Sequence, residues 1–172
     1  MIMMMYKNCI LMRPNISMKV IGIDPGYDRI GIAILEGDRS RQSVIYSECF
    51  ETGKNDTFDN RLVSVISHTR EIIQRYTPEV CVLETLFFSN NQKTALNVAE
   101  VRGGLIYMVK ESGCQIAQYT PIYVKQAVTG YGRSNKDNMI RMLEQLLTLP
   151  AKKRLDDEYD AIAIALTHLV SR

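Results

Sequence analysis

Two short apolar segments separated by a Pro-Gly turn constrain the fold of this chain more than any other feature. The first ends at Asp24, and the second covers residues 30–35. A parallel crossover needs about a dozen residues, far more than separate these segments, so we expect an antiparallel hairpin. Asp24 is unusual there, because an ionised carboxylate ending a buried strand is costly unless a cation or hydrogen bonds compensate it. A bound metal ion is the simplest compensation.

Asp24 is also an ordinary turn residue, since Asp before Pro-Gly is common turn chemistry. The hairpin alone does not decide between a turn residue and a ligand. Carboxylates at comparable places in the chain favour the ligand. Glu84 ends another apolar strand, and Asp157 and Asp160 open an apolar helix near the C-terminus.

The other hydrophobic patterns predict an α/β fold in which helices cover both faces of one mixed sheet. The pattern predicts a strand over residues 42–50, a helix over 57–76, a strand over 79–84, a helix over 93–110, a strand over 115–119, a helix from 121, a helix over 136–147 and a last helix ending near 170. A strand that returns beside the first one through the helix at 57–76 runs parallel to it, with a right-handed crossover. Glu84 would then lie next to Asp24.

Length and composition indicate a single soluble domain. The chain has 172 residues, of which 46% are hydrophobic, and no segment approaches the length of a membrane span. Its four cysteines lack C-x-x-C spacing, which fits reduced thiols in the cytoplasm. We expect residues 1–17, which are rich in Met and unlike a secretory signal, to be a flexible extension before a domain at 18–172.

Asp157 and Asp160 are three residues apart, so on a helix they lie on one face and can reach the same ion. The first turn of a helix also favours carboxylates, which leaves the alternative that both are only N-terminal helix acids. Asp156 shares a face with Asp160 as well. Spacing alone therefore does not choose between Asp156 and Asp157.

Four carboxylates without histidine or cysteine suit Mg²⁺ or Mn²⁺ better than zinc. Two such ions about 4 Å apart can activate a water and stabilise the leaving oxygen when a phosphodiester is hydrolysed. The overall charge is +2, and four metal-bound carboxylates would leave the rest of the protein with 21 basic and 15 acidic residues. That excess of positive charge moderately favours a polyanionic partner.

Candidate DNA contacts lie in two places. Lys125 and Lys136 flank the loop at 130–135, which contains Arg133, so positive charge and a flexible backbone occur together where phosphates could bind. Solvated helix lysines are the alternative. Phe87 lies in a polar loop after Glu84, where an aromatic ring can stack on an unpaired base for about 1–3 kcal/mol, although it could equally be a core residue.

Several separated motifs occur in one order along the chain. They are GIDPG at 22–26 with Gly31, Leu83-Glu84, AEVRG at 99–103, YTP at 119–121, VKQAVTG at 124–130 and D-x-x-D-AIAIALTH at 157–168. With these motifs, the chain from Met18 onward resembles the RuvC family of bacterial Holliday junction resolvases, the crossover junction endodeoxyribonucleases of the RNase H-like superfamily.

The resemblance implies an RNase H-like fold with a mixed five-stranded sheet, whose first three strands form an antiparallel meander. It also implies a homodimer that resolves four-way DNA junctions by paired symmetric nicks during recombination and repair. Mg²⁺, two ions per active site, would be the cofactor, with Mn²⁺ as a substitute, and RuvA and RuvB would be partner proteins. The metal-binding catalytic residues carried over by motif are Asp24, Glu84, Asp157 and Asp160, and the D-x-x-D-A spacing favours Asp157 over Asp156. Phe87, Lys125 and Lys136 match DNA-contacting positions.

Two other functions are compatible with parts of the sequence. ATPases of the actin-like superfamily also begin with an acidic residue in a Gly-rich hairpin, but this chain has no second Gly-rich phosphate loop and is short for two lobes. A junction-binding module with an inactive site is the non-enzymatic alternative. The presence of all four carboxylates argues against it.

Overall fold

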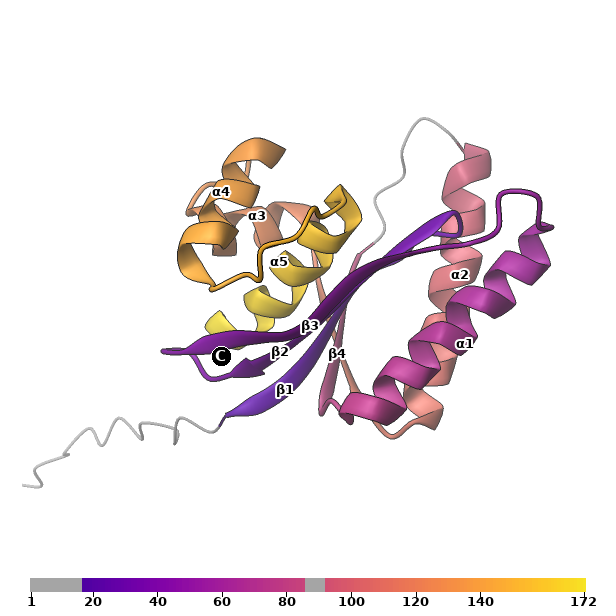
Figure 1. Ribbon diagram of the computed structural model, residues 1–172, viewed down its shortest axis with the longest axis horizontal. Coiled ribbons are helices and arrows are strands. Elements are labelled where there is room, and N and C mark those ends of the chain that lie inside the picture. The colour runs from indigo at the N-terminus through magenta and orange to yellow at the C-terminus, as the bar shows by residue number, and fades with distance from the viewer. Residues whose placement is uncertain (1–16, 86–91) are drawn as a thin grey trace, which may run out of the picture.

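A mixed five-stranded sheet lies between two layers of helices in the computed structural model, which describes residues 17–85 and 92–172 (Figure 1). The strands are β1 (Met18–Asp24), β2 (Arg29–Gly37), β3 (Gln42–Glu51), β4 (Val80–Glu84) and β5 (Gln115–Tyr119). The helices are α1 (Phe58–Tyr76), α2 (Gln92–Glu111), α3 (Pro121–Thr129), α4 (Lys136–Leu146) and α5 (Asp156–Val170). The predicted elements are all present, and their ends differ from the prediction by about one residue.

The strand order is β3-β2-β1-β4-β5. β1, β2 and β3 form an antiparallel meander, while β4 runs parallel to β1 and β5 runs parallel to β4. The predicted hairpin, the meander and the parallel return of the fourth strand are therefore confirmed.

The two faces of the sheet are covered by different helices, with α1 and α2 on one face and α3, α4 and α5 on the other (Figure 1). Strand residues alternate between the two cores because successive side chains point to opposite faces. In β1, Val20 belongs to the core beneath α5, and Ile21 and Ile23 belong to the core beneath α1 and α2. Asp24 continues the alternation and therefore points to the α5 face.

The same alternation holds in β4. Val80 and Val82 pack in the core beneath α5, whereas Cys81 and Leu83 pack in the opposite core. Glu84, the next residue, consequently points to the α5 face as well. The fold brings both strand-end acids to the same edge and the same face of the sheet.

Helix α5 is the central helix of this face. Its residues 161–166 are fully or almost fully buried, unlike those of a helix with one exposed side. It lies so close to β1 that a Cβ atom on Gly22 would be 2.2 Å from the carbonyl oxygen of Ala161, so only glycine fits there. Among the described residues, no helix is long and apolar enough to cross a membrane.

Candidate metal-binding site

Asp24 and Glu84 end two neighbouring parallel strands, and the residues before them, Ile23 and Leu83, are paired in the sheet. Burial is the main cause that raises the pKa of Asp24 to about 7, followed by the negative charges of Asp160, Glu84 and Asp157. Burial, and then the charge of Asp160, raises the pKa of Glu84 to about 7. Each carboxylate thus lies where negative charge is unfavourable, and other acids increase the penalty.

The first turns of α5 supply the other two predicted ligands. The pKa of Asp160 is raised by burial, and this shift is partly offset by Lys136, whose Nζ lies 2.9 Å from Oδ2 of Asp160. Asp157 Oδ2 lies 3.2 Å from Nη2 of Arg29, at the start of β2. The Sγ atom of Cys49, on β3, is 3.8 Å from the same oxygen.

Asp156 and Asp157 differ in their surroundings, although spacing alone could not separate them. The side chain of Asp156 is 65% exposed and pairs with Lys136 at 3.3 Å. Asp157 is 22% exposed, and its charge contributes to the raised pKa of Asp24. The geometry favours Asp157 as the member of the cluster. We refer below to Asp24, Glu84, Asp157 and Asp160 as the four carboxylates.

Gly31 allows α5 to approach the sheet at the level of the site. A Cβ atom on this residue would lie 1.8 Å from the carbonyl oxygen of Asp157 and 3.3 Å from Cβ of Ala161. Any larger residue would move the first turn of α5 away from β2. The absence of a side chain at this position lets the first turn of α5, which carries Asp157, lie against β2.

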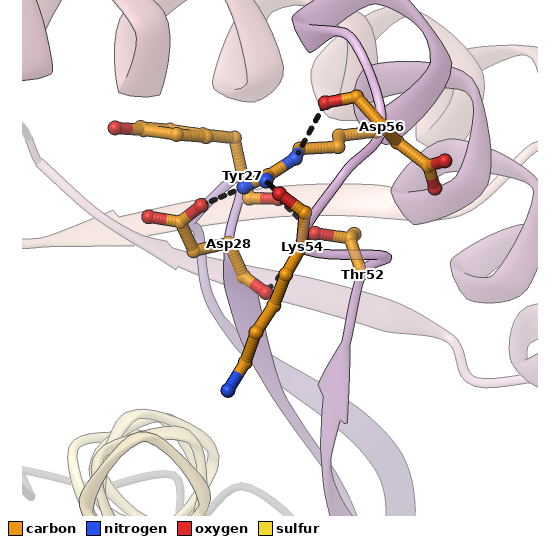
Figure 2. Close-up of polar contacts among 6 residues, drawn as sticks. Tyr27, Asp28, Thr52, Lys54 and Asp56 are labelled. Carbon is orange, nitrogen blue, oxygen red and sulfur yellow. Dashed lines mark hydrogen bonds and ion pairs between the residues drawn. The ribbon is translucent and has the colours of Figure 1, made fainter.

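The turn after Asp24 is tied to the segment between β3 and α1 by hydrogen bonds (Figure 2). The Thr52 hydroxyl donates to the carbonyl oxygen of Tyr27 at 2.8 Å. Arg61 donates to the carboxylate of Asp28, and also to the carbonyl oxygens of Lys54 at 2.6 Å and Asp56 at 3.1 Å. One guanidinium therefore holds two loops together beside the first strand-end acid.

A cleft of about 260 Å³ opens at the site. It is lined by Glu84, Pro121, Val124, Lys125, Lys136, Met139 and Asp160. Two carboxylates and two lysines thus share one depression, and the positive charge of Lys125 partly offsets the raised pKa of Glu84. The cleft can accept an anionic group next to the acids.

The donor set fits a hard divalent cation, because it consists of partly buried carboxylate oxygens that repel one another. Within residues 17–85 and 92–172, no protein cation forms an ion pair with Asp24 or Glu84. In that part of the chain, no three metal-ligating side chains lie close enough together to form a complete metal site.

The predicted DNA contacts lie in three settings. Lys125 and Lys136 line the cleft, whereas Arg133 is exposed in the loop between α3 and α4. Phe87 lies outside the described residues. Sequence reasoning assigned no role to Arg29 or Arg61, and it named Gly31 in a motif without its structural role. The position of Arg29 directly after the turn that follows Asp24 was a usable signal, whereas Arg61 lies on a helix and carried none.

Comparison with known proteins gives a consistent match. The model of the family described as crossover junction endodeoxyribonuclease RuvC matches residues 20–168. The RuvC protein of Moorella thermoacetica is 38% identical over 151 residues, which are 88% of this chain and 90% of that protein. The RuvC protein of Thermotoga maritima is 36% identical over 152 residues, with coverages of 88% and 90%.

Solved structures agree with this match. Thermus thermophilus RuvC in complex with a Holliday junction substrate superposes with a TM-score of 0.82 at 29% identity, covering 88% of this chain and 92% of that chain. The yeast mitochondrial Holliday junction resolvase Ydc2 gives a TM-score of 0.65 at 13% identity, with coverages of 87% and 77%, a likeness of fold alone. The RNase H-like fold implied by the resemblance is confirmed.

Proposed function

Because this chain belongs to the RuvC family of crossover junction endodeoxyribonucleases, we propose that the four carboxylates bind the metal ions with which it cuts DNA. The chain is an endonuclease that resolves Holliday junctions in DNA recombination and repair. The observation that supports this metal site best is the pair of partly buried strand-end acids, Asp24 and Glu84, whose pKa values are both raised to about 7.

We propose Mg²⁺, two ions per active site, with Mn²⁺ as a substitute. All four donors are carboxylates, which suit these hard ions. The chemistry supplied by the bound ions is activation of a water and stabilisation of the leaving oxygen of the phosphodiester. Asp24 and Glu84 hold their positions through the sheet, and Arg29 orients Asp157.

DNA binding is proposed for Lys125, Arg133 and Lys136, and Phe87 is proposed to stack on a base at the junction. The two lysines lie at the cleft beside the acids, where a phosphate next to the metal ions would meet them. The Nζ atom of Lys136 lies 2.9 Å from Oδ2 of Asp160, and 41% of the lysine side chain is exposed. The ammonium group is therefore accessible to a phosphate of bound DNA beside the acids. Phosphate contacts of this kind position the DNA but carry no sequence information.

We propose a homodimer formed through the exposed face of α2. Leu96 and Tyr107 on that face are 61% and 65% exposed, which is high for large apolar side chains. Gly103 lies between them in the sequence, and a Cβ atom there would meet nothing within 4 Å, so another backbone can approach closely. A second copy placed on this face would present two active sites to one symmetric junction.

Further proposals rest on the family. RuvA and RuvB are the proposed partner proteins, the cytoplasm is the proposed location, and the nuclease domain is proposed to span residues 18–172. The partner proposal is tested by immobilising junction DNA with and without this protein and measuring how much RuvA or RuvB each sample retains. Equal amounts of RuvA or RuvB in the two samples would contradict the proposal.

The function is tested with end-labelled four-way junctions incubated with Mg²⁺ or with EDTA, followed by mapping of the nicks. We expect paired nicks at symmetric positions in Mg²⁺ only. Junction binding without metal-dependent nicking would favour the inactive binding module instead. ATP hydrolysis in the absence of DNA would favour the actin-like ATPase.

A further inference from the structure

Glu158 is a buried acid beside the metal site that the proposed mechanism does not use. It follows Asp157 directly in the first turn of α5, and only 4% of its side chain is exposed. Its Oε1 atom accepts a hydrogen bond from the Ser47 hydroxyl at 2.6 Å. The same oxygen lies 2.7 Å from Nζ of Lys152 and 3.1 Å from Nε of Arg154.

These contacts join three separate parts of the protein. Ser47 is on β3, whereas Lys152 and Arg154 lie in the segment that connects α4 to α5. Lys152 also donates to the carbonyl oxygen of Ser47 at 2.7 Å. Glu158 therefore connects the start of α5 to a strand of the sheet and to the end of the preceding connection.

The Arg154 guanidinium is the most enclosed cation of this cluster, with 3% of its side chain exposed. It donates through Nη2 to the carbonyl oxygen of Pro150 at 2.8 Å. Its Nε lies within ion-pair distance of Glu158 but not in a direction that makes a hydrogen bond. The contact with Glu158 is thus a charge interaction at a site from which water is excluded, where separating the two ions is strongly unfavourable.

The direction of Glu158 determines the direction of its neighbours, because successive residues on a helix are rotated by about 100° about its axis. With Glu158 held on the β3 side, Asp157 points to Arg29 and Asp160 to Lys136. At this turn the backbone contact at Gly31 limits the distance between helix and sheet. Further along α5, residues 161–166 are packed in the core, whereas in the first turn the enclosed ion cluster of Glu158 adds a constraint on the rotation of the helix.

We propose that Glu158 is a positioning residue whose ion cluster with Lys152 and Arg154 fixes the rotation of α5, so that Asp157 and Asp160 present their carboxylates to the metal ions. This inference rests on the proposed metal site. It predicts an effect on metal affinity in the absence of DNA. A purely structural role would affect folding without that specific change.

The test measures the Mn²⁺ affinity of the wild type and several variants in the absence of DNA. Each protein is titrated with Mn²⁺, and the free ion is quantified by electron paramagnetic resonance. Glu158→Met leaves the two cations without their acid and is expected to lose stability. The double variant Glu158→Met/Arg154→Met removes the enclosed ion pair together, and such apolar replacements often fold as well as the original pair. Glu158→Gln keeps the acceptor for Ser47 and loses only the charge.

The matched control is Ile73→Ala, which removes core volume in the last turn of α1, at the end of the sheet away from the site. It is expected to lower the melting temperature without changing Mn²⁺ affinity. Cleavage of a four-way junction in a Mg²⁺ titration and junction binding in EDTA are measured on the same samples. Only the cleavage and Mn²⁺ results are expected to separate the Glu158 variants from this control.

We expect the double variant to fold, and to bind Mn²⁺ about tenfold more weakly with cleavage reduced to the same degree, as is typical when residues supporting metal ligands are removed. Glu158→Gln should show a smaller change in the same direction, and junction affinity should stay unchanged in both. Wild-type Mn²⁺ affinity in the folded double variant would overturn the inference. Failure of the wild type itself to bind Mn²⁺ or to cleave would instead overturn the proposed metal site.

Discussion

The two halves of the candidate site differ in how their negative charge is compensated. On the strand side, Asp24 and Glu84 are partly buried, their pKa values are raised to about 7, and within the described part of the chain no protein cation forms an ion pair with them. On the helix side, Asp157 pairs with Arg29 and Asp160 pairs with Lys136. The proposed metal ions would therefore supply the strand acids with the positive charge that the helix acids already receive from Arg29 and Lys136.

The two halves also differ in what positions them. Asp24 and Glu84 are fixed by the hydrogen-bonded ladder between β1 and β4, which is part of the core of the fold. The helix acids are placed by the packing of α5 on the sheet, which includes the close approach at Gly31. Under the proposed function, we expect the strand half to define where metal binds and the helix half to respond to changes in the packing of α5.

The largest expected effect is that of Asp24→Asn on cleavage. The amide preserves the shape of the side chain but removes the charge that binds a cation, so cleavage should fall by about 10³-fold or more, a loss of about 4 kcal/mol in transition-state stabilisation. Junction binding in EDTA should survive. The comparison variant is Asp156→Asn, which alters an exposed acid outside the cluster and should keep most activity. Equal losses in both variants would contradict the assignment.

The next prediction concerns how the free energy of unfolding depends on pH in the absence of metal. Because the pKa of Asp24 is raised from 3.8 to about 7, and that of Glu84 from 4.5 to about 7, the folded state keeps protons that the unfolded state releases between those values. The free energy of unfolding in EDTA should therefore fall by several kcal/mol as pH rises from about 4 to about 7, and then level off.

Urea denaturation between pH 4 and pH 8 measures this slope. Mg²⁺ should restore stability most strongly above pH 7, where the acids are ionised in the folded state. The double variant Asp24→Asn/Glu84→Gln should show a flatter profile and little response to Mg²⁺. A wild-type profile in EDTA that rises from pH 4 to pH 7 would contradict the account of the strand half.

The third prediction concerns a substitution that would move the helix acids of the site away from the sheet. In Gly31→Ala, the new Cβ atom meets the carbonyl oxygen of Asp157, and relief of that overlap moves α5 away from β2. We expect cleavage to fall by about 100-fold and the free energy of unfolding to fall by about 1–3 kcal/mol. The control is Gly104→Ala, whose Cβ atom would meet the flexible ends of Ile66, at 3.0 Å, and Leu62, at 3.8 Å, but no backbone atom among its nearest neighbours. Wild-type cleavage by Gly31→Ala would show that close approach of the helix is unnecessary.

The smallest expected effect is that of Lys136→Met. Loss of one phosphate contact should reduce the salt dependence of junction binding by about one unit in the log–log slope, with cleavage reduced by about tenfold. Arg75→Met, which removes an exposed charge at the far end of α1, is the control and should change neither quantity. An unchanged salt slope for Lys136→Met would show that Lys136 does not contact DNA and acts only as the ion-pair partner of Asp160.

Much of the strand half could be predicted from the sequence. The short gap after Asp24 required an antiparallel hairpin, and the helix before β4 required a parallel return, so Asp24 and Glu84 were expected to be neighbours. The period of two along each strand also determines which face they share. These inferences need only local patterns and the handedness of the crossover.

The helix half could not be predicted to the same degree. Spacing allowed either Asp156 or Asp157 to share a face with Asp160. The family motif favoured Asp157, and the physical reason, the packing of α5 on β2, is visible only in the structure. The contact of Glu158 with Ser47 joins residues 111 positions apart, and nothing in the sequence pattern specifies it. Contacts of this kind depend on how helix and sheet fit together in three dimensions.

The most direct test of the central claim is the position of Mn²⁺, measured by anomalous diffraction from crystals of this protein grown with that ion. We expect an anomalous peak in contact with the carboxylates of both Asp24 and Glu84, and its loss in Asp24→Asn crystals. Mn²⁺ bound only at other acids, with Asp24 and Glu84 contacting no ion, would contradict the claim that the strand half of the site requires a cation.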